Sequence, residues 1–235
     1  MTYRAYNRFL EADLEVVGSY KWGGRTSLIY EDACPAFARV LKERIKENYQ
    51  NVVFCGGETG SGKSTFAIRM CTLVDRNWDL ASNYIYDVQD LRQKLDDPQS
   101  TVSLFDEGTV SLNSGNAQRS EDKQMAVLFD TMRSLKWTTF IVAPKIQGIN
   151  KRVRETHVSF MCLVPSNPIM RGYDTRGCVQ IFRKIPKDWG DKFYWKLEAT
   201  TLFPKLTPRM QREYDAIKKE HQMRLLDQFI GDDKE

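Results

Sequence analysis

The chain lacks the features that mark membrane-spanning, secreted and disulfide-bonded proteins. No apolar run approaches the roughly 18 uncharged residues of a membrane span, and Met1–Arg4 begins no signal-peptide core. The five cysteines are odd in number and never spaced as CxxC, which predicts reduced, mostly buried thiols and neither a zinc site nor a disulfide framework. Internal repeats and Pro/Gly/Ser-rich linkers are also absent. With 41% hydrophobic residues among 235, we expect one soluble intracellular domain with a substantial core.

A glycine-rich run follows the apolar stretch Val52–Cys55. It fits the phosphate-binding P-loop pattern GxxxxGK[ST] and consists of Gly57, Glu58, Thr59, Gly60, Ser61, Gly62, Lys63 and Ser64. Glycines let such a loop curl so that backbone N–H groups point at phosphate, and the loop leads into a helix N-terminus with partial positive charge. We expect Lys63 to neutralise the β- and γ-phosphates, the Ser64 hydroxyl to bind Mg²⁺, and Thr65 to adjoin the nucleotide. The chain is therefore expected to bind a nucleoside triphosphate together with magnesium, and we expect that nucleotide to be ATP.

A pair of carboxylates follows about forty residues later. The buried strand predicted over Thr101–Phe105 ends in Asp106 and Glu107, as in a Walker B element followed by a catalytic glutamate. Asp106 is expected to hold magnesium directly or through water, and Glu107 to polarise the attacking water. A GTPase is disfavoured because the chain has no NKxD string and no glycine three residues after Asp106. A small-molecule kinase remains open, although kinases usually need no water-activating glutamate.

Apolar patterning predicts an α/β fold with about five parallel strands, whose ligand site lies at their carboxyl ends. The expected strands are 52–55, 84–86, 101–105, 138–143 and 157–164, and the expected helices are 35–47, 65–74, 88–95, 124–135 and 207–230. The helix 124–135 places Met125, Leu128, Met132 and Leu135 on one face. An antiparallel pair, 177–182 and 192–197, is expected at one edge of the sheet, and 18–30 is expected to form a hairpin with Gly23 and Gly24 at its turn.

An ordered set of segments then suggests a family. These segments are Leu104–Gly108 with Asn113, Asn116 and Arg119, then Arg133–Pro144, then Ile149–Arg154. From about Asn51 to Val164 the chain resembles the DNA-pumping P-loop ATPases of the FtsK–HerA class, and it is most similar to the small viral and plasmid members labelled Zot-like or genome-packaging ATPases. The resemblance implies a RecA/ASCE-like three-layer sandwich with a mostly parallel central sheet and an added antiparallel edge. We expect a single P-loop ATPase domain over 1–235, with a hairpin extension (1–33), a nucleotide-binding core (34–170) and C-terminal edge strands with a helix (171–235).

The resemblance also implies roles for residues outside the two motifs. Arg133 is the first candidate for an arginine that reaches the nucleotide of an adjacent subunit, Arg119 is the second, and Arg152 or Arg154 the third. The family often has a glutamine or asparagine that senses the γ-phosphate after the next strand. In this chain that strand ends in Ala143-Pro144-Lys145, so Lys145 or Gln147 is the candidate.

Positive charge is concentrated between Thr131 and Arg154. This segment contains six basic residues and no acidic one, although the whole chain is only +4. Such a segment suits a phosphate backbone or a neighbouring subunit's nucleotide. We expect Lys151, Arg152 and Arg154 to contact DNA through its backbone, independently of sequence. Neither His157 nor His221 has a spacing that suggests a metal site.

These observations predict an ATP-hydrolysing DNA motor that acts as a ring-shaped homo-oligomer and packages or transfers viral or mobile-element DNA. We expect it in the cytoplasm, or associated with a virion if it is viral, without membrane insertion and with a docking partner such as a capsid or secretion component. The alternatives are a Zot-like assembly or extrusion ATPase, disfavoured because those usually carry a membrane span, a nucleotide-switched binding protein and a small-molecule kinase.

Overall fold

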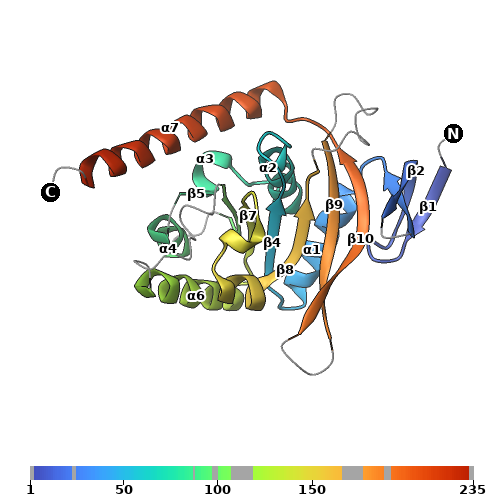
Figure 1. Ribbon diagram of the computed structural model, residues 1–235, viewed down its shortest axis with the longest axis horizontal. Helices are drawn as coiled ribbons and strands as arrows, with labels where there is room; N and C mark the ends of the chain where they lie inside the picture. Colours follow the sequence, from blue (N-terminus) through green and yellow to red (C-terminus); the bar gives the residue numbers. More distant parts are fainter. Residues whose placement is uncertain are drawn as a thin grey trace.

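One mixed sheet organises the computed structural model, which describes residues 3–22, 25–86, 88–96, 100–106, 119–165, 177–187 and 192–232 (Figure 1). Within these ranges the sheet has ten strands in the order β1-β2-β3-β10-β9-β8-β4-β7-β6-β5. The strands are β1 (Tyr3–Asn7), β2 (Ala12–Trp22), β3 (Arg25–Tyr30), β4 (Asn51–Gly56), β5 (Tyr84–Ile85), β6 (Val102–Phe105), β7 (Thr138–Val142), β8 (Val158–Leu163), β9 (Gly177–Pro186) and β10 (Phe193–Phe203). The helices are α1 (Cys34–Lys46), α2 (Lys63–Val74), α3 (Leu80–Asn83), α4 (Val88–Asp96), α6 (Arg119–Ser134) and α7 (Pro208–Asp232).

Five neighbouring strands run parallel, as the sequence predicts. They are arranged β8-β4-β7-β6-β5, so β7 lies between the strand that enters the P-loop and the strand that ends before Asp106. Asn51 of β4 and Val102 of β6 are both in register with Thr138 of β7. Because the strands are parallel and start level, their carboxyl ends meet at one edge, which brings the two motifs together.

Side chains of the parallel strands alternate between two apolar clusters, one on each face of the sheet. In β4, Val53 and Cys55 pack with residues of α1 and α2, whereas Val52 and Phe54 pack with residues of α4 and α6. Strands that are apolar at every position, such as β4, are typical of sheets covered on both faces. All five cysteines are buried and free, as expected for reduced thiols.

The N-terminal strands extend the sheet beyond its predicted edge. The predicted pairing of β9 with β10 is present, but β10 is not an edge strand, because β3 pairs with it in parallel and continues into β2 and β1. The prediction that this antiparallel pair forms an edge of the sheet is therefore wrong. β1 was not expected, and the hairpin of β2 and β3 is present, although its glycine turn lies outside the described residues.

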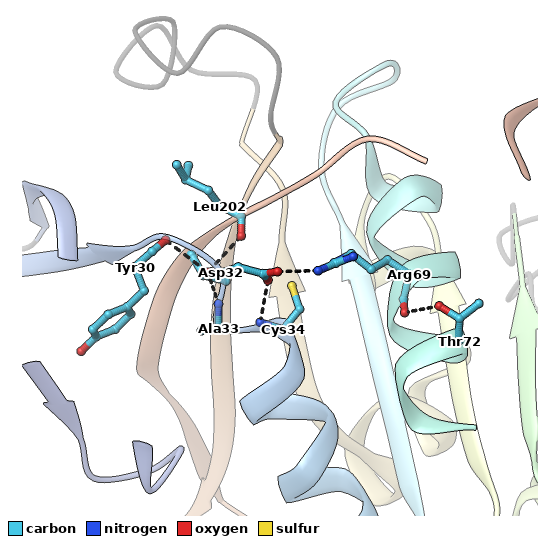
Figure 2. Close-up of polar contacts among 8 residues, drawn as sticks. Tyr30, Asp32, Ala33, Cys34, Arg69, Thr72 and Leu202 are labelled. Carbon is cyan, nitrogen blue, oxygen red and sulfur yellow. Dashed lines mark hydrogen bonds and ion pairs between the residues drawn. The ribbon is translucent and has the colours of Figure 1, made fainter. Parts of the chain in front are cut away.

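Polar contacts fix the junction between β3 and α1 (Figure 2). The Ala33 N–H donates to Thr201 Oγ1 of β10 at 2.7 Å, which ties the start of α1 to the C-terminal part of the sheet. Asp32 accepts from the Cys34 N–H at 3.1 Å and pairs with the guanidinium of Arg69 on α2. The N-terminal segment is thus bonded to the helix that follows the P-loop.

Helix α6 ends one residue earlier than expected. Phe129 and Met132 are buried, but Leu135 is 43% exposed, so its assignment to the apolar face is wrong. The helix ends at Ser134, and Lys136 then adopts a left-handed backbone (φ 56°), which turns the chain back towards β7.

The start of β8 also differs from the prediction. His157 is the last residue of a short π-helix, Val153–His157, and the strand begins at Val158. No helix within the described residues is both apolar and long enough to cross a membrane.

Candidate active site

The glycine-rich segment forms a loop between the end of β4 and the first residue of α2. Gly57 and Gly62 have φ angles of 145° and 94°, in the region that favours glycine. A Cβ on Gly57 would lie 2.3 Å from the carbonyl oxygen of Val164, so a larger residue cannot replace it without moving the backbone that directly follows β8. Gly57 is therefore required by its backbone and by close packing, and Gly62 by its backbone.

The motif lysine lies at the start of α2, where the loop ends. Lys63 Nζ donates to the carbonyl oxygen of Glu58 at 2.7 Å, across the loop. The Ser61 N–H also donates to the Glu58 carbonyl, at 3.2 Å. This lysine hydrogen bond is exposed.

The two predicted metal-binding side chains are hydrogen-bonded to each other. Ser64 Oγ donates to Asp106 Oδ1 at 3.1 Å, although 42 residues separate them in sequence. Asp106 is 4% exposed and directly follows β6. A hydroxyl and a carboxylate are hard oxygen donors, and Mg²⁺ typically takes one or two protein oxygens together with substrate phosphates and water. The donor types of Ser64 and Asp106 therefore fit a magnesium that binds together with phosphate.

A cavity of about 360 Å³ adjoins these residues. The P-loop and the start of α2 form one side, and Asp106 and the end of β7, Val142–Pro144, form another. Tyr214 and Lys218 of α7 complete the lining, and the Tyr214 hydroxyl donates to Asp106 Oδ2. The sequence analysis missed both residues. The spacing of Tyr214, Ile217 and His221, all buried, was the available signal that α7 has a face against the core.

The remaining predicted site residues do not line the cavity, or lie outside the described part of the chain. Glu107 lies outside the described residues. Arg119 is described only by its backbone, at the start of α6. Lys145 is exposed and follows Pro144, which does line the cavity, and Gln147 is exposed as well. Arg133 is exposed near the end of α6, just before β7 begins, and β7 leads from there to the cavity. Arg133 therefore lies at the opposite end of the sheet from Lys63 of the same chain.

The predicted DNA-contacting residues lie on the segment that leads into β8. Arg152 pairs with Asp130 of α6 at 3.3 Å, Arg154 lies 3.9 Å from Glu155, and Lys151 is exposed. Two of the three cations therefore have a carboxylate neighbour.

A basic groove of about 570 Å³ adjoins this segment, and the sequence analysis missed it because its cations come from distant elements. Its basic residues are Arg44 of α1, Arg183 and Lys184 of β9, and Lys192. Three of them lie over aromatic rings: Arg44 over Phe160, Lys184 over Phe193 and Arg183 over Phe9, 4.3–5.2 Å from the ring centroids. Such cation–π contacts orient a cation without neutralising it. Arg183 also pairs with Glu198 at 2.9 Å, and Glu155 lines the same groove.

The pKa of His157, which lines this groove, is lowered, mainly because the side chain is buried. Burial lowers the pKa of His157, and the positive charges of Arg152, Arg133 and Lys184 lower it further, against the opposing effect of Asp130. Burial also lowers the pKa of Arg44, and the charge of Arg183 adds to that effect. Several cations thus lie at this end of the sheet, together with the carboxylates of Asp130 and Glu155.

Comparisons with known proteins give matches among solved structures. No protein family model matches the sequence, and no curated protein matches it significantly. Among solved structures, the chain is similar to the N-terminal domain of zonular occludens toxin from Neisseria meningitidis, with a TM-score of 0.44 and 11% identity. The match covers 68% of this chain and 96% of that one. A similarity of this level does not establish a shared activity.

Proposed function

We propose that the chain is a P-loop ATPase that binds ATP with magnesium and hydrolyses it at the carboxyl end of the parallel strands. The observation that carries the proposal is the hydrogen bond between Ser64 and Asp106, beside Lys63 in a cavity large enough for phosphates. A glycine-rich turn without a nucleotide would not need a serine and a buried aspartate from separate motifs to meet there.

In this proposal each side chain has a distinct role. Backbone N–H groups of the loop and the Lys63 ammonium bind the phosphates, and Ser64 and Asp106 hold the metal. Magnesium bound there would neutralise charge on the β- and γ-phosphates. Glu107 follows Asp106 directly and is proposed to orient the attacking water.

The strand order supports a RecA/ASCE-like three-layer arrangement. β7 separates the P-loop strand from the Asp106 strand, so the end of β7 at Val142–Pro144 reaches the cavity between the two motifs. A residue just after that end, Lys145 or Gln147, is proposed as the γ-phosphate sensor. We further propose that the N-terminal strands, the core and the C-terminal segment form one domain, since all three contribute to one sheet.

We also propose that hydrolysis drives movement of DNA by a ring of subunits, in packaging or transfer. The positive charge of Lys151, Arg152 and Arg154 and of the adjoining groove supports contact with a phosphate backbone. Because Arg133 lies far from the cavity of its own chain, it is proposed to act on the nucleotide of a neighbouring subunit. A docking partner such as a capsid or secretion component remains part of this proposal.

Steady-state ATP hydrolysis with and without duplex DNA tests the proposal, with Lys63→Ala as the control for contaminating activity. DNA-stimulated hydrolysis supports the motor, and hydrolysis without stimulation favours a Zot-like assembly ATPase. Phosphate transferred to a small acceptor would instead indicate a kinase. ATP binding without turnover would indicate a nucleotide-switched binding protein.

A further inference from the structure

The C-terminal helix α7 passes over the carboxyl end of the parallel strands (Figure 1). Its first turn is capped by Thr207, whose Oγ1 accepts from the Met210 N–H at 3.3 Å. Tyr214 and Ile217 belong to the same apolar cluster as Phe66 of α2. Further along, His221 packs edge-on against Tyr86, with ring centroids 4.8 Å apart. Helix α7 is thus anchored both beside the P-loop helix and beside β5.

Two hydroxyl groups from different helices bind the two oxygens of Asp106. Ser64 of α2 donates to Oδ1, and Tyr214 of α7 donates to Oδ2. Tyr214 is only 7% exposed, so packing restricts its ring. Hydrogen bonds to both oxygens restrict how the carboxylate can turn, and a carboxylate has lone pairs enough to accept a hydrogen bond and bind a metal at the same time.

We propose that Tyr214 is a positioning residue for Asp106, and that α7 is therefore a working part of the nucleotide site. The Tyr214 hydroxyl holds the Asp106 carboxylate in the orientation that places it beside Ser64, towards the cavity. Lys218, one turn further along α7, lies over the Tyr214 ring at 5.9 Å and lines the same cavity. The inference rests on the proposed function, since it assigns the C-terminal helix a role in holding magnesium with ATP.

The test uses the full chain and the substitution Tyr214→Phe, which removes the hydroxyl and keeps the ring. Binding of a fluorescent, non-hydrolysable ATP analogue is titrated with MgCl₂. The magnesium concentration for half-saturation is expected to rise roughly tenfold, as for the loss of one hydrogen bond to a charged group. Analogue binding without magnesium is expected to stay at the parent value. Tyr194→Phe, at a half-exposed tyrosine on β10, is the matched control and is expected to change neither quantity.

A double-mutant cycle separates positioning from general packing. In an Asp106→Asn background, Tyr214→Phe is expected to change the magnesium dependence no further, because its effect acts through that carboxylate. Thermal unfolding without magnesium or nucleotide checks that every variant is folded at the titration temperature.

The outcomes distinguish the inference from the proposed function. If the parent chain binds the analogue and Tyr214→Phe leaves its magnesium dependence unchanged, the inference is overturned and the ATPase proposal stands. If magnesium binds more tightly to Tyr214→Phe, the hydroxyl competes with the metal, and the positioning role is also overturned. If the parent chain does not bind the analogue at all, the proposed function fails.

Discussion

The carboxylate of Asp32 pairs with the guanidinium of Arg69, which joins the segment after β3 to the P-loop helix (Figure 2). The two side chains are 31% and 24% exposed, so their pairing is screened by solvent less than a surface ion pair is. Asp32 also accepts from the Cys34 N–H, and burial followed by the charge of Asp32 raises the pKa of the Cys34 thiol. A single aspartate thus supports the start of α1 and the position of α2.

Replacing Asp32 with alanine is expected to lower the free energy of unfolding by about 1–3 kcal/mol, because it leaves a partly buried guanidinium without its carboxylate. Urea unfolding measures the change. Glu43→Ala is the matched control, since Glu43 pairs with Arg39 at 4.0 Å on an exposed helix face, and it is expected to cost no more than about 0.5 kcal/mol. Equal costs for the two substitutions would contradict a structural role for the Asp32–Arg69 pair.

Lys63→Ala is expected to abolish tight ATP binding or hydrolysis while the fold survives, because its ammonium donates to loop backbone at an exposed position and not within the core. Equilibrium binding of labelled ATP and steady-state turnover measure the loss, and thermal unfolding checks the fold. Unchanged affinity together with unchanged turnover would remove Lys63 from the site.

Glu107→Gln is expected to retain ATP and magnesium but to slow hydrolysis by roughly a hundredfold or more, as for the loss of a general base. Asp106→Asn is expected to differ by weakening magnesium binding, since Asp106 is hydrogen-bonded to Ser64, the other proposed metal ligand. Single-turnover hydrolysis and nucleotide retention separate the two effects. Hydrolysis by Glu107→Gln at the parent rate would mean that another group activates the water.

Arg133 is expected to act between subunits, because it lies at the end of α6, away from the cavity of its own chain. An arginine supplied in trans can change turnover by on the order of a thousandfold. Subunits with Arg133→Ala are mixed with subunits carrying Lys63→Ala, and ATP hydrolysis is expected to rise above that of either variant alone. If no mixing ratio restores hydrolysis in an assembly proven to exchange subunits, Arg133 has no such role, and Arg119 becomes the next candidate.

Replacing Lys151, Arg152 and Arg154 with alanine is expected to reduce the slope of log affinity for DNA against log salt by about two to three units. DNA-stimulated hydrolysis is expected to disappear while basal hydrolysis remains. The matched control replaces Arg209, Arg212 and Lys219, three exposed cations of α7, and removes the same charge. An unchanged salt slope with lost basal hydrolysis would instead place Arg152 or Arg154 at an ATP site.

The parts of the site that sequence analysis predicted are contiguous motifs. The residues Gly57–Ser64 and Asp106 lie within short segments whose local pattern carries their chemistry, and parallel pairing then brings them to one edge. Tyr214 and the groove cations Arg44 and Arg183 could not be predicted in this way, because each depends on packing between elements far apart in the chain. The same limit applies to β3, whose partner on one side is β10, about 170 residues later.

The pairing of β3 with β10 also constrains the order in which the sheet can be completed during synthesis. Until Phe193–Phe203 has left the ribosome, β3 has its hairpin partner β2 on one side and unpaired backbone groups on the other. An unpaired strand edge can pair with another nascent chain. Most of the protein must therefore be synthesised before this edge is covered, and shortening the chain before β10 is expected to favour aggregation.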